Sequence, residues 1–153
     1  MKKREANTYF TLGLRFLHDD DCKRAISLLS IAIDLDSHFA EAYGFRGLAY
    51  FTQGTYQEAM EDYNAALSLD HSLDEIYYFR ATLQLVEKHY EEAIKDFSSA
   101  IELNKYFAEA YFYRGICKGL LDDEKGGTYD IKAAASLGMP EAQKTLNGKG
   151  IVW

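Results

Sequence analysis

The sequence predicts an all-helical fold made of repeated helix pairs, and three observations carry that prediction. The same residue types return every 34 residues along most of the chain. Within each 34-residue unit, apolar residues recur at helical spacing and not with the alternation of a strand. The chain of 153 residues has a single proline, Pro140, so no proline interrupts a helix before its last residues.

Four units follow one another in register, without insertion or deletion between them. We predict repeats over residues 6–39, 40–73, 74–107 and 108–139, within a single domain of residues 1–153. The recurring residues are Tyr9, Tyr43, Tyr77 and Tyr111; Gly13, Gly47, Ala81 and Gly115; Ala25, Ala59, Ala93 and Gly127; Ala32, Ala66, Ala100 and Ala134; and Leu35, Leu69, Leu103 and Leu137.

Each unit divides into two helices. In the second unit the first helix is expected over residues 40–53 and the second over residues 56–69, with a polar turn around Gly54 between them. Short polar segments that stop helices, such as Asp70 to Ser72, separate the units. The small residues let the two helices of a pair approach closely, because a bulky group there would overpack.

The two ends of the repeat array are expected to be capped. In the first unit, polar residues such as Thr8 stand where inner units have alanine, which fits a face that no earlier unit covers. A glycine ends the last repeat and Pro140 starts a further helix. We expect a capping helix over residues 140–147 that shields the last pair, followed by a tail over residues 148–153. Trp153 is either mobile with that tail or docked on the last helices.

Residues at equivalent positions of the four repeats form what we call a column. Two columns of charged residues vary together along the repeats. Units two to four each have an arginine followed 16 residues later by an aspartate, whereas the first unit has leucine at both positions. We predict structural ion pairs that bridge the two helices of each of these units; the alternative is unrelated charges on a solvated face. The predicted pairs are Arg46 with Asp62, Arg80 with Asp96, and Arg114 with Asp130.

The second unit carries a specific pattern. In order along the chain it contains Ala40-Glu41-Ala42-Tyr43, Gly47, Tyr50, Tyr56, Glu58-Ala59, Tyr63, Ala66-Leu67 and Leu69-Asp70. This pattern resembles the tetratricopeptide repeat, and the junction after the fourth unit is similar to the Sel1-like variant of that family. The resemblance implies antiparallel helix pairs stacked into a right-handed α-solenoid. It also implies a concave groove, lined by the first helix of each pair, in which the family usually binds peptides or protein segments.

The last two units depart from the pattern. Gln84 and Lys118 replace the aromatic residue found at Tyr50, which predicts looser packing in these units. Gly126 and Gly127 lie side by side in the second helix of the last unit. Because glycine in a helix costs about 1 kcal/mol relative to alanine, we expect that helix to fray most.

The concave columns of the family fall on many apolar residues, which accounts for a high aromatic content of 14%. An apolar stripe of this kind marks an interaction site, and aromatic anchors dominate interface energies. The alternative is that neighbouring first helices bury these side chains against each other. The predicted partner-binding groove consists of Phe10, Leu14 and Leu17; Glu41, Phe45, Leu48 and Phe51; Glu75, Tyr78, Phe79 and Thr82; and Glu109, Phe112, Tyr113 and Ile116.

The chemistry of these columns selects among partners. Family members that bind chaperone tails clamp a terminal carboxylate with lysine, asparagine and arginine. The corresponding columns here hold apolar residues and Glu75, so we expect no carboxylate-clamp chaperone tail. Glu41, Glu75 and Glu109 favour a protein or peptide segment with apolar anchors and basic residues.

Composition and charge argue against several other classes of function. The net charge of -7 disfavours nucleic acid, and no stretch reaches the roughly 18 apolar residues of a membrane span. The four histidines and two cysteines lack the spacing of a metal site, and no nucleophile–base pair or phosphate-binding loop is present. We therefore expect no metal, no cofactor and no enzymatic activity. The two cysteines fit reduced thiols in the cytoplasm.

The sequence thus predicts a non-catalytic protein–protein interaction module or scaffold that holds a partner segment in an aromatic, acid-rimmed groove. The main alternative is a self-associating structural protein whose groove or end faces are buried in a homo-oligomer.

Overall fold

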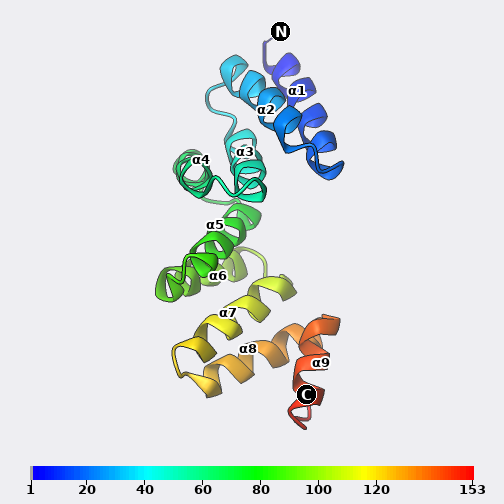
Figure 1. Ribbon diagram of the computed structural model, residues 1–153, viewed down its shortest axis with the longest axis vertical. Helices are drawn as coiled ribbons and strands as arrows, with labels where there is room; N and C mark the ends of the chain where they lie inside the picture. Colours follow the sequence, from blue (N-terminus) through cyan, green and yellow to red (C-terminus); the bar gives the residue numbers. More distant parts are fainter. Residues whose placement is uncertain (1) are drawn as a thin grey trace. The chain divides into compact units, whose positions relative to one another are not determined.

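Nine helices make up residues 2–153, the part of the chain that this computed structural model describes (Figure 1). Within that range there is no β-strand. The prediction of an all-helical fold is therefore confirmed. The helices are α1 (Lys2–His18), α2 (Cys22–Leu35), α3 (Ala40–Thr52), α4 (Tyr56–Leu69), α5 (Asp74–Val86), α6 (Tyr90–Leu103), α7 (Ala108–Leu120), α8 (Glu124–Ser136) and α9 (Pro140–Gly148).

The turn within each helix pair has the same backbone geometry. One residue in each turn adopts the left-handed conformation, with φ of 60° at Asp20, 79° at Gly54, 65° at Lys88 and 64° at Asp122. These four residues are spaced by 34 positions, so they share one column of the repeat. One residue with a positive φ, a conformation that is unusual for residues other than glycine, therefore lies in the turn of all four helix pairs.

The chain forms two compact units, residues 1–76 and residues 77–153. In the first unit, α1 packs against α2, α2 against α3, and α3 against α4. Small alanines and Leu29 form one buried core there. The approach of α3 to α4 depends on Gly47, because a Cβ atom at that position would lie 2.8 Å from the side chain of Tyr63. The small column thus permits the close packing that the sequence predicted for it.

In the second unit, α6 packs against α7, α7 against α8, and α8 against α9. One buried core surrounds Phe97, whose ring is fully inaccessible. A second core joins α8 to α9 and contains Ile131 and Leu146. The last helix therefore covers apolar surface of the last repeat, as a capping helix does.

The helices α7 and α8 approach each other through two glycines. A Cβ atom on Gly115 would lie 2.8 Å from the carbonyl oxygen of Gly127, and one on Gly127 would lie 2.7 Å from the carbonyl oxygen of Gly115. The neighbouring Gly126 donates its backbone N–H to the capping carboxylate of Asp123 at 2.9 Å. The helix α8 is continuous over Glu124–Ser136 and Gly127 has a packing role, and the expectation that this helix frays most stays a prediction.

The tail returns to the last helix. Gly138, with φ of 93°, lies in the turn between α8 and α9, and α9 begins at Pro140. The indole N–H of Trp153 donates to the side-chain oxygen of Asn147 on α9 at 3.0 Å, and the tryptophan is 45% exposed. Trp153 is thus in contact with α9 while much of its ring stays accessible.

Candidate functional site

In the first unit, the predicted groove residues lie mainly on α1 and α3, two helices that contact each other. The ring centroid of Phe10 lies 4.7 Å from that of Phe39 and 5.9 Å from that of Phe45. Phe10, Leu17 and Phe45 also pack against the buried core around Leu29. They are half-buried, so each side chain uses part of its surface for the fold and leaves part of it accessible.

In the second unit, Tyr78 lies at the centre of an aromatic cluster. Its ring centroid is 4.9 Å from that of Phe107, 5.9 Å from that of Phe97 and 6.2 Å from that of Tyr113. Burial raises the pKa of Tyr78 to about 12, and the neighbouring Tyr113 adds to this effect. The phenol is therefore neutral at physiological pH. Phe112 extends the cluster, with its ring edge-on to Tyr113 at 5.4 Å.

None of the predicted groove residues is fully buried. The sequence left open whether their aromatic side chains are exposed or buried against each other, and the answer is intermediate. Ring contacts fix their positions within each unit, yet every apolar member stays partly accessible. Glu41 and Glu75 in the first unit and Glu109 in the second are exposed. The remaining half-buried members are Leu14, Leu48, Phe51, Phe79, Thr82 and Ile116.

The arginine of the second repeat lies in a dense set of contacts. Arg46 donates from Nε and Nη2 to the two carboxylate oxygens of Asp62, both at 2.7 Å, and from Nη1 to Ser30 at 3.0 Å. Its guanidinium also lies over the rings of Tyr43 and Tyr50, at 5.5 and 5.9 Å from their centroids. Hydrogen bonding to Asp62 raises the pKa of Arg46. Arg80 and Arg114 lie over Tyr77 and Tyr111 in the same way, at 5.8 and 5.5 Å, so the tyrosines of this column contact the arginines in repeats two to four.

The same bidentate geometry recurs in the second unit. Arg80 contacts Asp96, and Arg114 contacts Asp130, through two hydrogen bonds each at 2.7 to 2.8 Å. The carboxylate of Asp96 is 9% exposed and that of Asp130 is fully buried. Paired, charge-assisted bonds of this kind are strong and fix geometry. These charges therefore bridge the two helices of each pair and do not lie on a solvated face.

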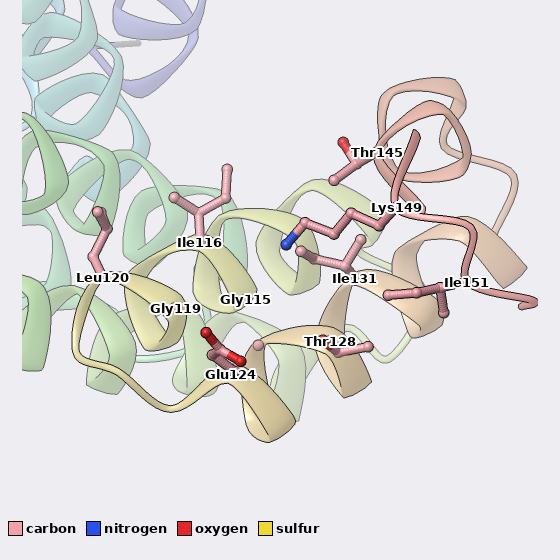
Figure 2. A pocket seen from close by; sticks show the side chains of 11 residues that line it. Gly115, Ile116, Gly119, Leu120, Glu124, Thr128, Ile131, Thr145, Lys149 and Ile151 are labelled. Carbon is pink, nitrogen blue, oxygen red and sulfur yellow. The ribbon is translucent and has the colours of Figure 1, made fainter. Parts of the chain in front are cut away.

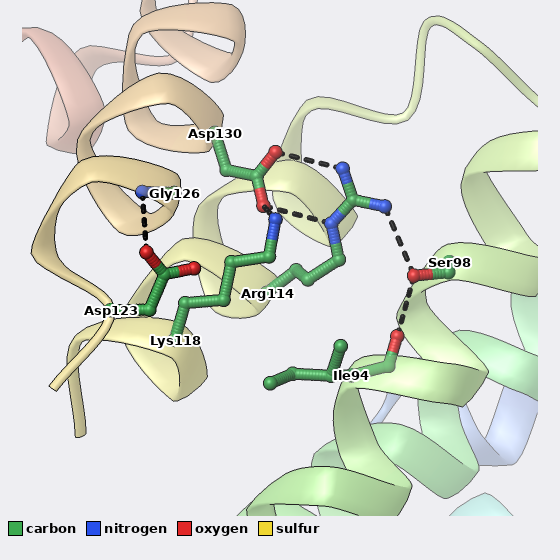
Figure 3. A network of polar contacts seen from close by, with 7 residues as sticks. All are labelled: Ile94, Ser98, Arg114, Lys118, Asp123, Gly126 and Asp130. Atoms are coloured by element: carbon green, nitrogen blue, oxygen red, sulfur yellow. Dashed lines mark hydrogen bonds and ion pairs between the residues drawn. The ribbon is translucent and has the colours of Figure 1, made fainter. Parts of the chain in front are cut away.

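The last repeat adds a second cation to its aspartate. Lys118 places its ammonium 2.8 Å from Oδ2 of Asp130, while Arg114 donates from Nη1 to the hydroxyl oxygen of Ser98 at 3.0 Å (Figure 3). The sequence predicted looser packing at Lys118, because an aromatic residue is missing there. The structure gives this lysine an ion pair with a fully buried carboxylate, and the looser packing of the last two repeats stays a prediction.

Sequence reasoning missed two kinds of polar partner. The serine contacts of Arg46 and Arg114 have a signal in the sequence, since Ser30 and Ser98 lie two repeats apart in one polar column. Lys118 has no such signal, because no other repeat has a lysine in its column. A contact that occurs once leaves no periodic trace.

Histidine, cysteine and carboxylate side chains are the groups that hold metals, and thiols are candidate nucleophiles. Among residues 2–153, no group of three or more histidine, cysteine, aspartate or glutamate side chains is arranged to hold a metal ion. Cys22 and Cys117 are buried and free, and burial raises the pKa of both thiols, to about 11 for Cys117. Thiols with raised pKa values are poor nucleophiles. No helix within the same range is long and apolar enough to cross a membrane.

Comparison with known families identifies the repeat. Two family models described as tetratricopeptide repeats match the chain, one over residues 10–72 and the other over residues 74–107. Together the two matches span more than half of the chain. The protein therefore belongs to the tetratricopeptide repeat family, as its sequence pattern predicted. A comparison with curated proteins found no match.

Solved structures share the fold at low sequence identity. A crystal structure of MamA is 22% identical, with a TM-score of 0.80, over 90% of this chain and 81% of that one. PilF of Pseudomonas aeruginosa is 18% identical, with a TM-score of 0.83, over 96% and 71% of the two chains. The first tetratricopeptide domain of Spaghetti, solved with the HSP90 peptide SRMEEVD, is 23% identical, with a TM-score of 0.75, over 78% and 95%. These likenesses confirm the predicted all-α solenoid.

Proposed function

We propose that this protein is a non-catalytic interaction module, or scaffold, that binds a segment of a partner protein on the first helices of its repeats. The observation that supports this best is the set of apolar side chains that ring contacts hold in place without burying them. Phe10 and Phe45 in the first unit, and Tyr78 and Phe112 in the second, are of this kind. Anchors that are already ordered lose little conformational entropy on binding.

The charges on the same helices favour a basic partner. Glu41, Glu75 and Glu109 are exposed, and the chain carries a net charge of -7. The HSP90 peptide in the Spaghetti structure is instead rich in carboxylates. Because the groove columns of this chain lack the lysines and arginines of a carboxylate clamp, we do not expect it to bind a tail of that type. A segment with apolar anchors flanked by lysine or arginine fits better.

We also place the protein in the cytoplasm, where its two free, buried thiols would stay reduced. The acidic charge makes nucleic acid an unfavourable partner.

The proposal is tested with peptides selected from a random display library and then synthesised. Groove variants Leu48→Glu and Thr82→Glu place a carboxylate on half-buried positions of α3 and α5. The matched controls, Leu69→Glu and Leu103→Glu, change exposed leucines on the second helices α4 and α6. We expect each groove variant to weaken binding at least about tenfold, because binding would have to remove water from a carboxylate among the apolar anchors. Retained helicity is checked by circular dichroism. Equal binding by all four variants would refute the proposal.

A self-associating structural protein is the alternative. Exposed leucines favour it, namely Leu12 on α1 and Leu120 and Leu121 at the end of α7. Light scattering over a range of concentrations separates the two functions. A monomer supports the interaction module, whereas a tight dimer that Leu48→Glu dissociates supports self-association.

A further inference from the structure

The last repeat contains a pocket of about 600 Å³, which lies within the second unit (Figure 2). Its walls come from α7, from the first half of α8, and from α9 with the residues after it. We refer to it as the last-repeat pocket. The lining residues are Gly115, Ile116, Gly119, Leu120, Glu124, Gly127, Thr128, Ile131, Thr145, Lys149 and Ile151.

The pocket exists because large side chains found in the other repeats are missing from the last one. At three lining positions, the last repeat has a smaller or more polar residue than most of the equivalent positions of the other repeats. In the second repeat, the rings at two of these columns, Phe51 and Tyr56, pair with centroids 5.7 Å apart. Gly119 stands in the column of Leu17, Phe51 and Leu85; Glu124 in that of Cys22, Tyr56 and Tyr90; and Thr128 in that of Ile26, Met60 and Ile94.

Gly119 is not explained by the packing of the helices. Gly115 and Gly127 are needed because their backbones touch, but a Cβ atom on Gly119 would meet nothing within 4 Å. Glycine is nevertheless disfavoured in a helix relative to any residue with a side chain other than proline. The fold therefore gains nothing from this glycine, and its effect is to leave the pocket open.

The lining of the pocket is amphipathic. Ile116, Leu120 and Ile131 provide apolar walls, while Glu124 lies at one side. From the opposite side, the side chain of Lys149 reaches over the hollow (Figure 2). The pocket therefore has an apolar surface with a charged group on each side of it. The carboxylate on one side attracts a cation, and the ammonium group on the other donates hydrogen bonds.

We propose that the last-repeat pocket receives an aromatic side chain of the partner segment. The ring would occupy space that Phe51 and Tyr56 fill in the second repeat. A neighbouring lysine or arginine of the segment would lie toward Glu124, and Lys149 would donate to a carbonyl or carboxylate oxygen of the segment. The volume is within the range of pockets that bind small molecules, so it has room for the ring together with part of the neighbouring segment. This inference deepens the proposed function and rests on it, since Ile116 belongs both to the groove and to the pocket.

The probe for this site is N-acetyl-phenylalanyl-lysinamide. Backbone amide signals of three glycines that line the pocket, Gly115, Gly119 and Gly127, report on occupancy in two-dimensional NMR spectra. We expect saturable shifts of these signals, with a dissociation constant of about 1 mM for so small a ligand. N-acetyl-alanyl-lysinamide should bind at least about tenfold more weakly, because it lacks the apolar area of the ring.

Two substitutions at one position separate pocket filling from other effects. Gly119→Phe fills the pocket with the residue that the second repeat has in this column, and Gly119→Ala is the matched control that leaves it open. We expect Gly119→Ala to bind the phenylalanine probe within about twofold of the unchanged protein, and Gly119→Phe to bind it at least about tenfold more weakly. Circular dichroism verifies that both variants fold.

The proposal that this pocket binds an aromatic side chain is refuted by any of three results. The phenylalanine probe binds both variants equally, the alanine probe binds as tightly as the phenylalanine probe, or no glycine signal shifts. It is also refuted if the protein forms a dimer that Gly119→Phe dissociates, because a second copy is then the occupant. Segments that respond to Leu48→Glu but not to Gly119→Phe refute the pocket and leave the proposed function standing. Probe binding without any effect of Leu48→Glu or Thr82→Glu on segments supports the pocket and refutes the proposed groove.

Discussion

Replacing Asp130 with leucine should destabilise the second unit strongly. The carboxylate of Asp130 is fully buried and accepts hydrogen bonds from Arg114 at 2.7 and 2.8 Å, and Lys118 lies 2.8 Å from it. The side chains of Arg114 and Lys118 are only 15% and 23% exposed, so the substitution leaves two largely buried cations without a counter-charge. Breaking a buried ion pair by removing one partner costs about 3–5 kcal/mol.

The first repeat supplies the matched control. It has Leu12, Phe16 and Leu28 in the columns of Arg114, Lys118 and Asp130. The triple variant Arg114→Leu, Lys118→Phe, Asp130→Leu therefore installs an apolar set that this chain already uses. Because replacing a whole buried ionic group with apolar residues is often neutral, the triple variant should recover most of the lost stability.

Urea unfolding followed by circular dichroism measures these changes, with an unchanged slope as the check that the unfolding reaction is the same. Asp62→Leu should cost less than Asp130→Leu, because Asp62 is 8% exposed and pairs with Arg46 alone among the ion pairs observed. A cost below about 1 kcal/mol for Asp130→Leu, the value of an exposed pair, would refute the reasoning. So would a triple variant no more stable than the single one.

Two further predictions concern packing and pH. Gly127→Ala should lower the unfolding free energy by about 1–3 kcal/mol despite its better helix propensity, because its Cβ would lie 2.7 Å from the carbonyl oxygen of Gly115. Thermal denaturation tests this, and a variant as stable as the unchanged protein would contradict it. The pKa of Cys117 is raised from 9.0 to about 11 by burial, so the unfolded chain loses this proton at a lower pH than the folded one. The unfolding free energy should therefore fall as pH rises from 9 to about 11. Cys117→Ala, which copies Ala49 of the second repeat, should remove that part of the fall in urea titrations; an identical pH profile would contradict the assignment.

The amino-acid sequence by itself determined the helix pairs, the family and the column positions of the charged pairs. The physical reason is that a contact that recurs from one repeat to the next requires the same residue types at intervals of 34 positions. The pairing of Arg46 with Asp62 could be predicted from the sequence because both columns have leucine in the first repeat. The tyrosine column was visible for the same reason, although its contact with the arginines was not.

Only the tertiary structure decided the features that occur once. Gly127 lies in a column of small residues and Gly119 in a column of large ones, but only the structure shows that Gly119 faces open space and that Gly127 touches the backbone of a neighbouring helix. Lys118 lies on the buried carboxylate of Asp130 because it extends from α7 toward α8, a direction that no periodicity encodes. The half-burial of residues such as Tyr78 likewise depends on how closely neighbouring helices approach within a unit. The distance between two helices depends on all the side chains packed between them. It therefore cannot be derived from the residues of any single column.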